Sequence, residues 1–261
     1  MQPSAGQKLK RAAAAGGAWY STLFVIRALV DRCRDRLDNR LAAIERHKGI
    51  VEPWTVSARR FTASDNRALY DSYDWGALGE EWTSSPEWKA GLVAEFLVPN
   101  VPENGAALEI GPGGGRWTDL LRRRARTLVV VDVSARALDI CRDRFKESTN
   151  IEYLLSDGGT LGVPDGSVDA IWSYDVFVHV NPVDARRYFR EFYRVLRPQA
   201  RGVIHHPGDQ RVNPTRSDLT GRMVGEFCRE AGLNLLSQTG KFASDQSPTD
   251  LISVVQKPAS K

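Results

Sequence analysis

The segment from residue 107 to residue 117 constrains the fold of this chain more than any other part of its sequence. A short apolar run ends in Glu109, and the glycine-rich turn 111–115 follows it, before residues that favour a helix. A second apolar run ends in Asp132, 21 residues after Gly111. This order predicts two parallel strands joined by a crossover helix. Glycines let the turn approach a ligand closely, and an acid at the tip of the second strand can accept both hydroxyls of a ribose.

The acid that precedes the turn indicates the charge of the ligand. A turn that holds a pyrophosphate has the pattern G-x-G-x-x-G and leads directly into a helix. Here Glu109 stands two residues before the first glycine, where it would repel a phosphate and attract a cation. The run from Glu109 to Gly115 resembles motif I (E/DxGxGxG) of the class I S-adenosylmethionine-dependent methyltransferases, whose cofactor carries an ammonium and a sulfonium group.

Four further blocks continue this resemblance, in the family's order, over roughly residues 70–257. Asp132 matches the ribose-binding acid, and Ser156-Asp157-Gly158 matches the loop that contacts adenine. Residues 169–175 match the fourth strand, and residues 191–198 match the helix and turn before the fifth. The alternative is a Rossmann-like domain that binds a nucleotide or no ligand.

The resemblance implies an α/β fold with S-adenosylmethionine as cofactor. We expect a Rossmann-like, seven-stranded methyltransferase sheet, parallel with an antiparallel C-terminal hairpin, and an N-terminal helical extension. The apolar runs predict strands at 106–110, 127–132, 151–155, 169–174, 200–206, 233–240 and 250–256, and helical segments at 117–125, 134–146, 183–196 and 217–231. The resemblance places around the cofactor Glu109, Gly111, Gly113, Asp132, Ser134, Asp157, Gly158 and Tyr174.

Three parts are expected along the chain: an N-terminal helical arm and linker over 1–66, a helical lid over 67–100, and the cofactor-binding domain over 101–261. Residues 19–47 contain neither proline nor glycine, and their apolar side chains recur at steps of three and four. This seam predicts a helix that makes a homodimer, with docking on its own domain or on a lipid surface as alternatives. Its members are Leu23, Ile26, Val30, Cys33, Leu37 and Ile44.

The catalytic candidates follow the fourth and fifth strands, because ligands of open parallel sheets sit at the carboxyl ends of strands. His179 and His206 are predicted as bases that could take a proton from a hydroxyl, with Asp175 beside them. Of the adjacent pair, His206 is favoured as the one that faces the acceptor, and His205 is predicted to contact the substrate. No metal site is predicted, although a divalent ion such as magnesium, held by these histidines and an aspartate, stays an alternative. Tyr73 and Trp82, on a glycine- and serine-rich loop of the lid, are predicted to contact the acceptor.

The sequence thus predicts an enzyme that methylates a hydroxyl oxygen of a small polar acceptor, in character a sugar or small-molecule O-methyltransferase acting on a sugar or oligosaccharide. An N- or C-methyltransferase of a natural product or lipid is one alternative, and a non-catalytic, cofactor-binding interaction protein is another. Residues 1–60 hold twelve Lys and Arg against five Asp and Glu, whereas the rest of the chain is mildly acidic. The basic surface is therefore not in the catalytic domain, which argues against a nucleic-acid substrate. No apolar run is long enough to span a membrane, and three scattered cysteines fit the cytoplasm.

Overall fold

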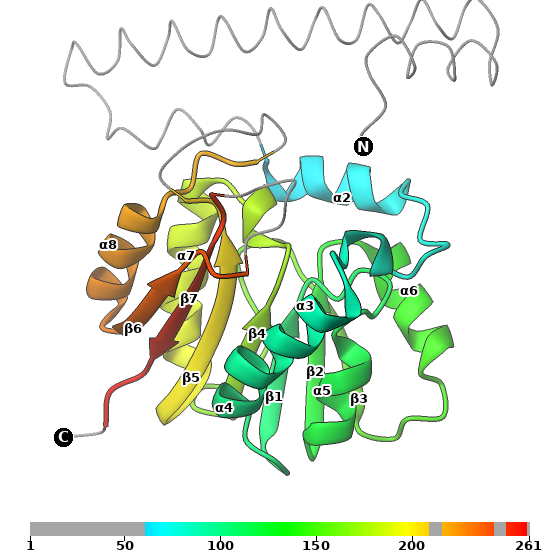
Figure 1. Cartoon of the computed structure of the whole chain (residues 1–261), viewed down its shortest axis with the longest axis horizontal. Helices are drawn as coiled ribbons and strands as arrows, with labels where there is room; N and C mark the ends of the chain where they lie inside the picture. The colour runs from blue at the N-terminus through cyan, green and yellow to red at the C-terminus, as the bar shows by residue number, and fades with distance from the viewer. Residues whose placement is uncertain (1–60, 209–215, 243–248, 260–261) are drawn as a thin grey trace, which may run out of the picture. The chain divides into compact units, whose positions relative to one another are not determined.

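Seven strands form one mixed sheet in the order β3-β2-β1-β4-β5-β7-β6 (Figure 1). The computed structural model describes residues 61–208, 216–242 and 249–259. The predicted helix at 19–47 and the homodimer assigned to it lie outside these residues. The strands are β1 (Ala106–Ile110), β2 (Thr127–Asp132), β3 (Ile151–Leu155), β4 (Val168–Ser173), β5 (Leu196–His206), β6 (Asn234–Thr239) and β7 (Leu251–Gln256).

The pairing of the strands confirms the predicted fold class. The first five strands are parallel, and β7 runs antiparallel to both β5 and β6. The C-terminal hairpin was therefore predicted correctly, with β7 inserted between β5 and the edge strand β6. β5 begins at Leu196, earlier than the predicted start at residue 200, and its pairing with β4 is irregular near Val168.

Helices cover both faces of the sheet. They are α2 (Ala63–Asp71), α3 (Pro86–Leu92), α4 (Val98–Asn100), α5 (Thr118–Arg124), α6 (Ala135–Arg144), α7 (Pro182–Val195) and α8 (Gly221–Ala231), with the short helices η2 (Glu80–Trp82), η3 (Val93–Leu97) and η4 (Phe177–His179). On one face, Leu92 and Leu121 pack with Trp172 of β4 in a single apolar cluster. On the other face, α7 and α8 meet through Phe189 and Phe227, whose ring centroids are 6.1 Å apart. Each such buried side chain contributes roughly 1.5–3 kcal/mol.

Local capping explains where most helices begin. Ser134, Asn181 and Thr220 each accept a hydrogen bond from a backbone N–H in the first turn of α6, α7 and α8. Part of the predicted linker is helical, because Thr62 and Asp65 form a reciprocal capping box that starts α2. In Figure 1, α2 lies across the end of the sheet where the parallel strands finish. No helix within the described residues is both long and apolar enough to cross a membrane.

Candidate functional site

A cavity of about 370 Å³ opens where β1, β2, β4 and β5 end, and α2, the loop after it, η4 and α7 contribute to its other walls. The sequence-predicted residues that line it are Gly111, Gly113, Asp132, Gly158, Tyr174, Asp175, His179, His205 and Trp82. Those that do not line it are Glu109, Ser134, Asp157, Tyr73 and His206. The structure therefore brings most of the predicted residues into one space, as expected for strand ends in an open sheet.

The turn after β1 requires glycine at two positions on the cavity wall. Gly111 and Gly113 have φ values of 70° and 55°, which side-chain-bearing residues rarely adopt. A Cβ on Gly111 would lie 2.3 Å from Val176, and a Cβ on Gly113 would lie 2.6 Å from the ring of Trp75. The bare backbone of the turn can thus lie directly against a ligand, while Trp75 packs on the turn from the lid side.

Two acids flank this turn. Asp132, at the end of β2, is partly open to the cavity and accepts a hydrogen bond from the Ser134 N–H at 2.8 Å. Burial by the surrounding protein raises its pKa to about 6. Glu109 lies behind the turn, where burial raises its pKa to about 8; its Oε2 accepts a hydrogen bond from Thr118 at 2.7 Å. Its Oε1 has no hydrogen-bond partner among the described residues.

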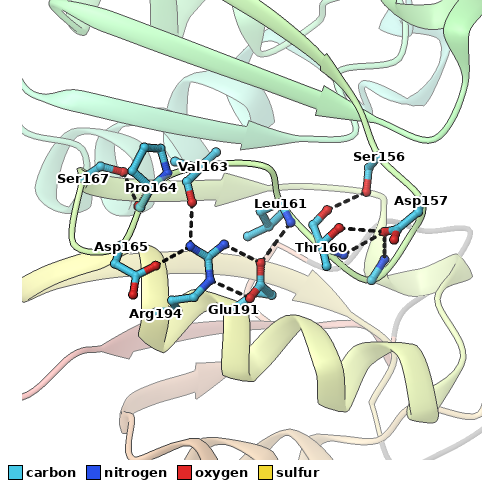
Figure 2. A network of polar contacts seen from close by, with 11 residues as sticks. Ser156, Asp157, Thr160, Leu161, Val163, Pro164, Asp165, Ser167, Glu191 and Arg194 are labelled. Atoms are coloured by element: carbon cyan, nitrogen blue, oxygen red, sulfur yellow. Dashed lines mark hydrogen bonds and ion pairs between the residues drawn. The ribbon is translucent and has the colours of Figure 1, made fainter.

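The loop after β3 is held by side chains of its own and of α7 (Figure 2). Asp157 accepts hydrogen bonds from Thr160 and from the Gly159 N–H, and these contacts hold its pKa below the ordinary value. Its carboxylate is therefore engaged within the loop, and Gly158 is the residue that lines the cavity. Glu191 of α7 accepts from the Leu161 N–H at 3.0 Å, which fixes the far side of the loop.

Helix α2 ties the cofactor-side loops together, a role that the sequence did not predict. Arg67 donates to the carbonyl oxygen of Val133 at 3.0 Å, and Asp71 accepts from the Ser134 hydroxyl at 2.6 Å. Ser134 is consequently the N-cap of α6 and an anchor for α2, and its side chain does not reach the cavity.

A chain of ionisable side chains forms the wall at the ends of β4 and β5. Asp175, with φ of 62°, pairs with Arg116 and lies 3.1 Å from Nδ1 of His205. Burial opposes ionisation of Asp175, but His205 and Arg116 outweigh it and hold the pKa of this carboxyl well below its ordinary value. The Asp175 N–H also donates a hydrogen bond to the same Nδ1 at 3.2 Å. Beyond the ring, Nε2 of His205 lies 3.7 Å from Asp250, which pairs with Arg216 at 3.1 Å.

The geometry reverses the choice between the two adjacent histidines. His205 lines the cavity, and its ring stacks on that of Tyr174 with centroids 4.2 Å apart. His206 points to the other face of the sheet, because successive residues of a strand alternate in direction. It is fully buried, with Nδ1 2.7 Å from the carbonyl oxygen of Pro207 and Nε2 2.6 Å from the Ser253 hydroxyl.

The remaining predicted residues lie on the lid side of the cavity. His179, in η4, lines it beside the ring of Tyr70, at 6.1 Å between centroids. Trp82 lines it as well, whereas Tyr73 packs behind Trp75 and donates its hydroxyl to Glu81 at 3.0 Å. Within the described ranges, no group of three His, Cys, Asp or Glu side chains has the arrangement of a metal site.

Comparison with known proteins assigns the central part of the chain. A family profile described as "Methyltransferase domain" matches residues 108–204. The chain is 35% identical to a demethylmenaquinone methyltransferase of Tropheryma whipplei over 133 residues, which are 51% of this chain and 53% of that protein. It is 30% identical to a malonyl-[acyl-carrier protein] O-methyltransferase of a Marinomonas species over 112 residues, 41% of this chain and 40% of that protein. The chain thus spans about half the length of these curated relatives or less.

The fold agrees with this assignment. The crystal structure of a SAM-dependent methyltransferase from Aquifex aeolicus superposes with a TM-score of 0.54 at 16% identity, covering 71% of this chain and 98% of that one. The residues at the site also fit the cofactor: a turn of four glycines and one proline, a buried carboxylate oxygen without a partner among the described residues beneath it, and an acid at the tip of β2. Residues 108–204 therefore match a methyltransferase domain, and the fold around them is that of the class I S-adenosylmethionine-dependent methyltransferases, whose cofactor is S-adenosylmethionine.

Proposed function

We propose that this protein transfers a methyl group from S-adenosylmethionine to a hydroxyl oxygen of a small polar acceptor. The observation that carries the proposal is the shared cavity. One part of its wall holds the glycine turn and Asp132, and another part holds Asp175, His179 and His205. A cofactor and an acceptor bound against these two parts would lie side by side, which is what an in-line displacement requires.

The cofactor supplies a methyl group activated by the positive charge on its sulfur. We assign the ribose hydroxyls to the Asp132 carboxylate, which lines the cavity and is ionised at neutral pH. The backbone of Gly111 and Gly113 supports the rest of the molecule, and a cation bound above the turn would favour ionisation of Glu109, whose pKa burial raises to about 8. Gly158 provides a flat surface for the adenine end, and the loop around it is fixed by α7.

His205 is our candidate for the base that takes the acceptor's proton. This role requires the tautomer with its proton on Nδ1, in which the ring donates to the Asp175 carboxylate and gives up the bond that Nδ1 accepts from the Asp175 N–H, so that Nε2 can accept a proton. The imidazolium that forms would lie between the carboxylates of Asp175 and Asp250, 3.1 Å and 3.7 Å away, which favour its charge. His179 also lines the cavity and is the second candidate.

The relatives support part of this proposal. The name of the Marinomonas protein states O-methylation of malonyl-[acyl-carrier protein], which favours oxygen as the acceptor atom. The name of the Tropheryma protein points to a quinone, which favours the alternative of an apolar acceptor. Neither name supports the sugar or oligosaccharide expected from the sequence. That acceptor, the lid role of residues 67–100, the exclusion of nucleic acid and the cytoplasmic location stay predictions.

A product assay tests the proposed activity. Purified protein with S-adenosylmethionine is offered sugars, phenols, hydroxy acids and amines, and release of S-adenosylhomocysteine is measured. With the best acceptor, His205→Gln should lower kcat by roughly 10²–10⁴-fold, because general-base catalysis is lost, while cofactor affinity is kept. His179→Gln is the matched comparison at the second candidate. Preference for amines, or a His205→Gln variant with the wild-type rate, would contradict O-methylation with this base.

A further inference from the structure

Two buried hydrogen-bond donors, on residues that line the cavity, have no partner among the described residues: Nη1 of Arg116 and Nε1 of Trp117. Both residues line the cavity and are nearly enclosed, with 4% and 2% of their surface exposed. Both groups are hydrogen-bond donors only and have no acceptor atom. Their need for a partner therefore does not depend on any protonation state.

The surroundings of Arg116 stabilise its positive charge but leave part of its hydrogen-bonding capacity unused. Its guanidinium lies 5.1 Å from the ring centroid of Trp117, 5.7 Å from that of Tyr174 and 6.0 Å from that of Trp82. Ring faces attract a cation but supply no oxygen for its N–H groups. Asp175 binds Nη2 only, and it also contacts His205, so its charge is shared between two partners.

Buried donors without partners are costly, and in a cavity wall they commonly mark where a ligand binds. A ligand that satisfies these two donors must supply acceptor oxygens. One of the donors, the guanidinium, carries a full positive charge. A carboxylate meets both demands, because its two oxygens match the fork of a guanidinium. The aromatic rings around Arg116 further favour a flat molecular body over a large hydrated anion.

We propose that the methyl acceptor is a small hydroxycarboxylic acid whose carboxylate is bound by Arg116 and Trp117. The inference rests on the proposed function and deepens it. Asp175 contacts Arg116 through one carboxylate oxygen and His205 through the other. The carboxylate bound by Arg116 and the candidate base His205 are therefore separated by about the width of the Asp175 carboxylate and its two contacts. A molecule with a carboxylate at one end and a hydroxyl a few bonds away can reach both. Arg116 is thus the residue that selects the acceptor.

Calorimetry with two matched probes tests this proposal. 4-Hydroxybenzoate and its neutral isostere 4-hydroxybenzamide are titrated into the full-length protein saturated with S-adenosylhomocysteine. The carboxylate should bind the wild-type protein at least tenfold more tightly than the amide. Arg116→Gln should remove that preference, Arg116→Lys should retain part of it, and Trp117→Phe should reduce it severalfold. Arg122→Gln, which alters an arginine paired with Asp119 outside the cavity lining, should leave it unchanged.

The outcomes separate this inference from the proposed function. If S-adenosylhomocysteine binds but the two probes bind equally, or Arg116→Gln keeps the preference, the carboxylate site is refuted and the methyltransferase assignment stands. If S-adenosylhomocysteine does not bind the wild-type protein, the proposed function itself fails. Should Arg116→Gln not fold, the wild-type preference and its reduction in Trp117→Phe decide the question, since that change removes one N–H and keeps an aromatic ring.

Discussion

Asp132 allows one prediction in which stability and binding change in opposite directions. Its carboxylate lines the cavity, and burial raises its pKa from 3.8 to about 6. An acid with a raised pKa in the folded state destabilises that state once it is ionised, so its cost appears as pH rises from about 4 to about 6 and persists above that window. Asp132→Asn removes this cost and keeps an oxygen that can accept from the Ser134 N–H.

The size of both effects follows from the shift of about two pKa units. At pH 7, Asp132→Asn should stabilise the cofactor-free protein by up to about 3 kcal/mol, at 1.36 kcal/mol per unit. The same change should weaken cofactor binding about tenfold, because charge-assisted hydrogen bonds to the ribose are lost. If the cofactor binds the ionised acid, the fraction available falls from about 0.9 at pH 7 to about 0.1 at pH 5, so wild-type affinity should also fall about tenfold.

Thermal unfolding of the cofactor-free protein and calorimetric titration of S-adenosylhomocysteine between pH 5 and pH 7 measure these effects. The variant should show a raised Tm at pH 7 and a binding constant that varies little with pH. Comparison of the two proteins at each pH cancels other groups that titrate in this range. A wild-type affinity that is flat from pH 5 to pH 7, or a variant that binds as tightly as wild type, would refute the assignment of Asp132 to the cofactor.

Four further results are expected. Glu191→Ala leaves the Leu161 N–H without its acceptor, so unfolding free energy should fall by about 1–2 kcal/mol and Tm by about 2–8 °C in calorimetric scans. Gly113→Ala places a Cβ 2.6 Å from Trp75 at a φ of 55°, and both stability and S-adenosylhomocysteine affinity should drop; unchanged affinity would contradict the cofactor role of the turn. ¹⁵N NMR of His205 in the presence of an acceptor tests the base role: a proton on Nδ1 alone leaves Nε2 able to accept, whereas a proton on Nε2 alone, which the Asp175 N–H to Nδ1 contact favours, would count against His205 as a base. Deleting residues 1–48 should yield a monomer by light scattering with cofactor binding intact; a truncated protein that stays dimeric would rule out the helix at 19–47.

The sequence predicted the sheet well because its signals are local. Each parallel strand is a short apolar run closed by glycine, polar or acidic residues, and β1, β2 and β3 begin and end where those runs do. The start of α2 was missed although its capping box, Thr62 with Asp65, is readable in the sequence. The start of β5 was misplaced because Pro198 and Gln199, which has a φ of 69°, look like the end of a turn, yet they continue an irregular strand.

Within the site, the sequence predicted only the residues that belong to recognisable motifs. Residues that belong to the turn or to strand tips, such as Gly111, Asp132 and Asp175, were placed in the cavity. Arg116 was overlooked, since an arginine after a glycine turn is ordinarily a surface residue, and its burial depends on rings from distant segments. The choice between His205 and His206 depended on which face of the sheet each side chain of β5 points to. The neighbouring sequence does not determine this, but the pairing of β5 with β7 does.

The position of β7 inside the sheet also bears on how the protein is made. His205 and His206 pair with Ile252 and Leu251, so the β5 edge that presents the candidate base is completed by a strand synthesised only after α8 and β6. Until that strand leaves the ribosome, β5 exposes a row of unpaired backbone groups, the kind of edge that other chains can join. The cofactor-binding part, from β1 to β4, can assemble earlier. A ribosome-bound chain that stops before residue 251 should therefore already contain the folded glycine turn and Asp132. The edge of β5 that carries His205 should then still lack its partner strand.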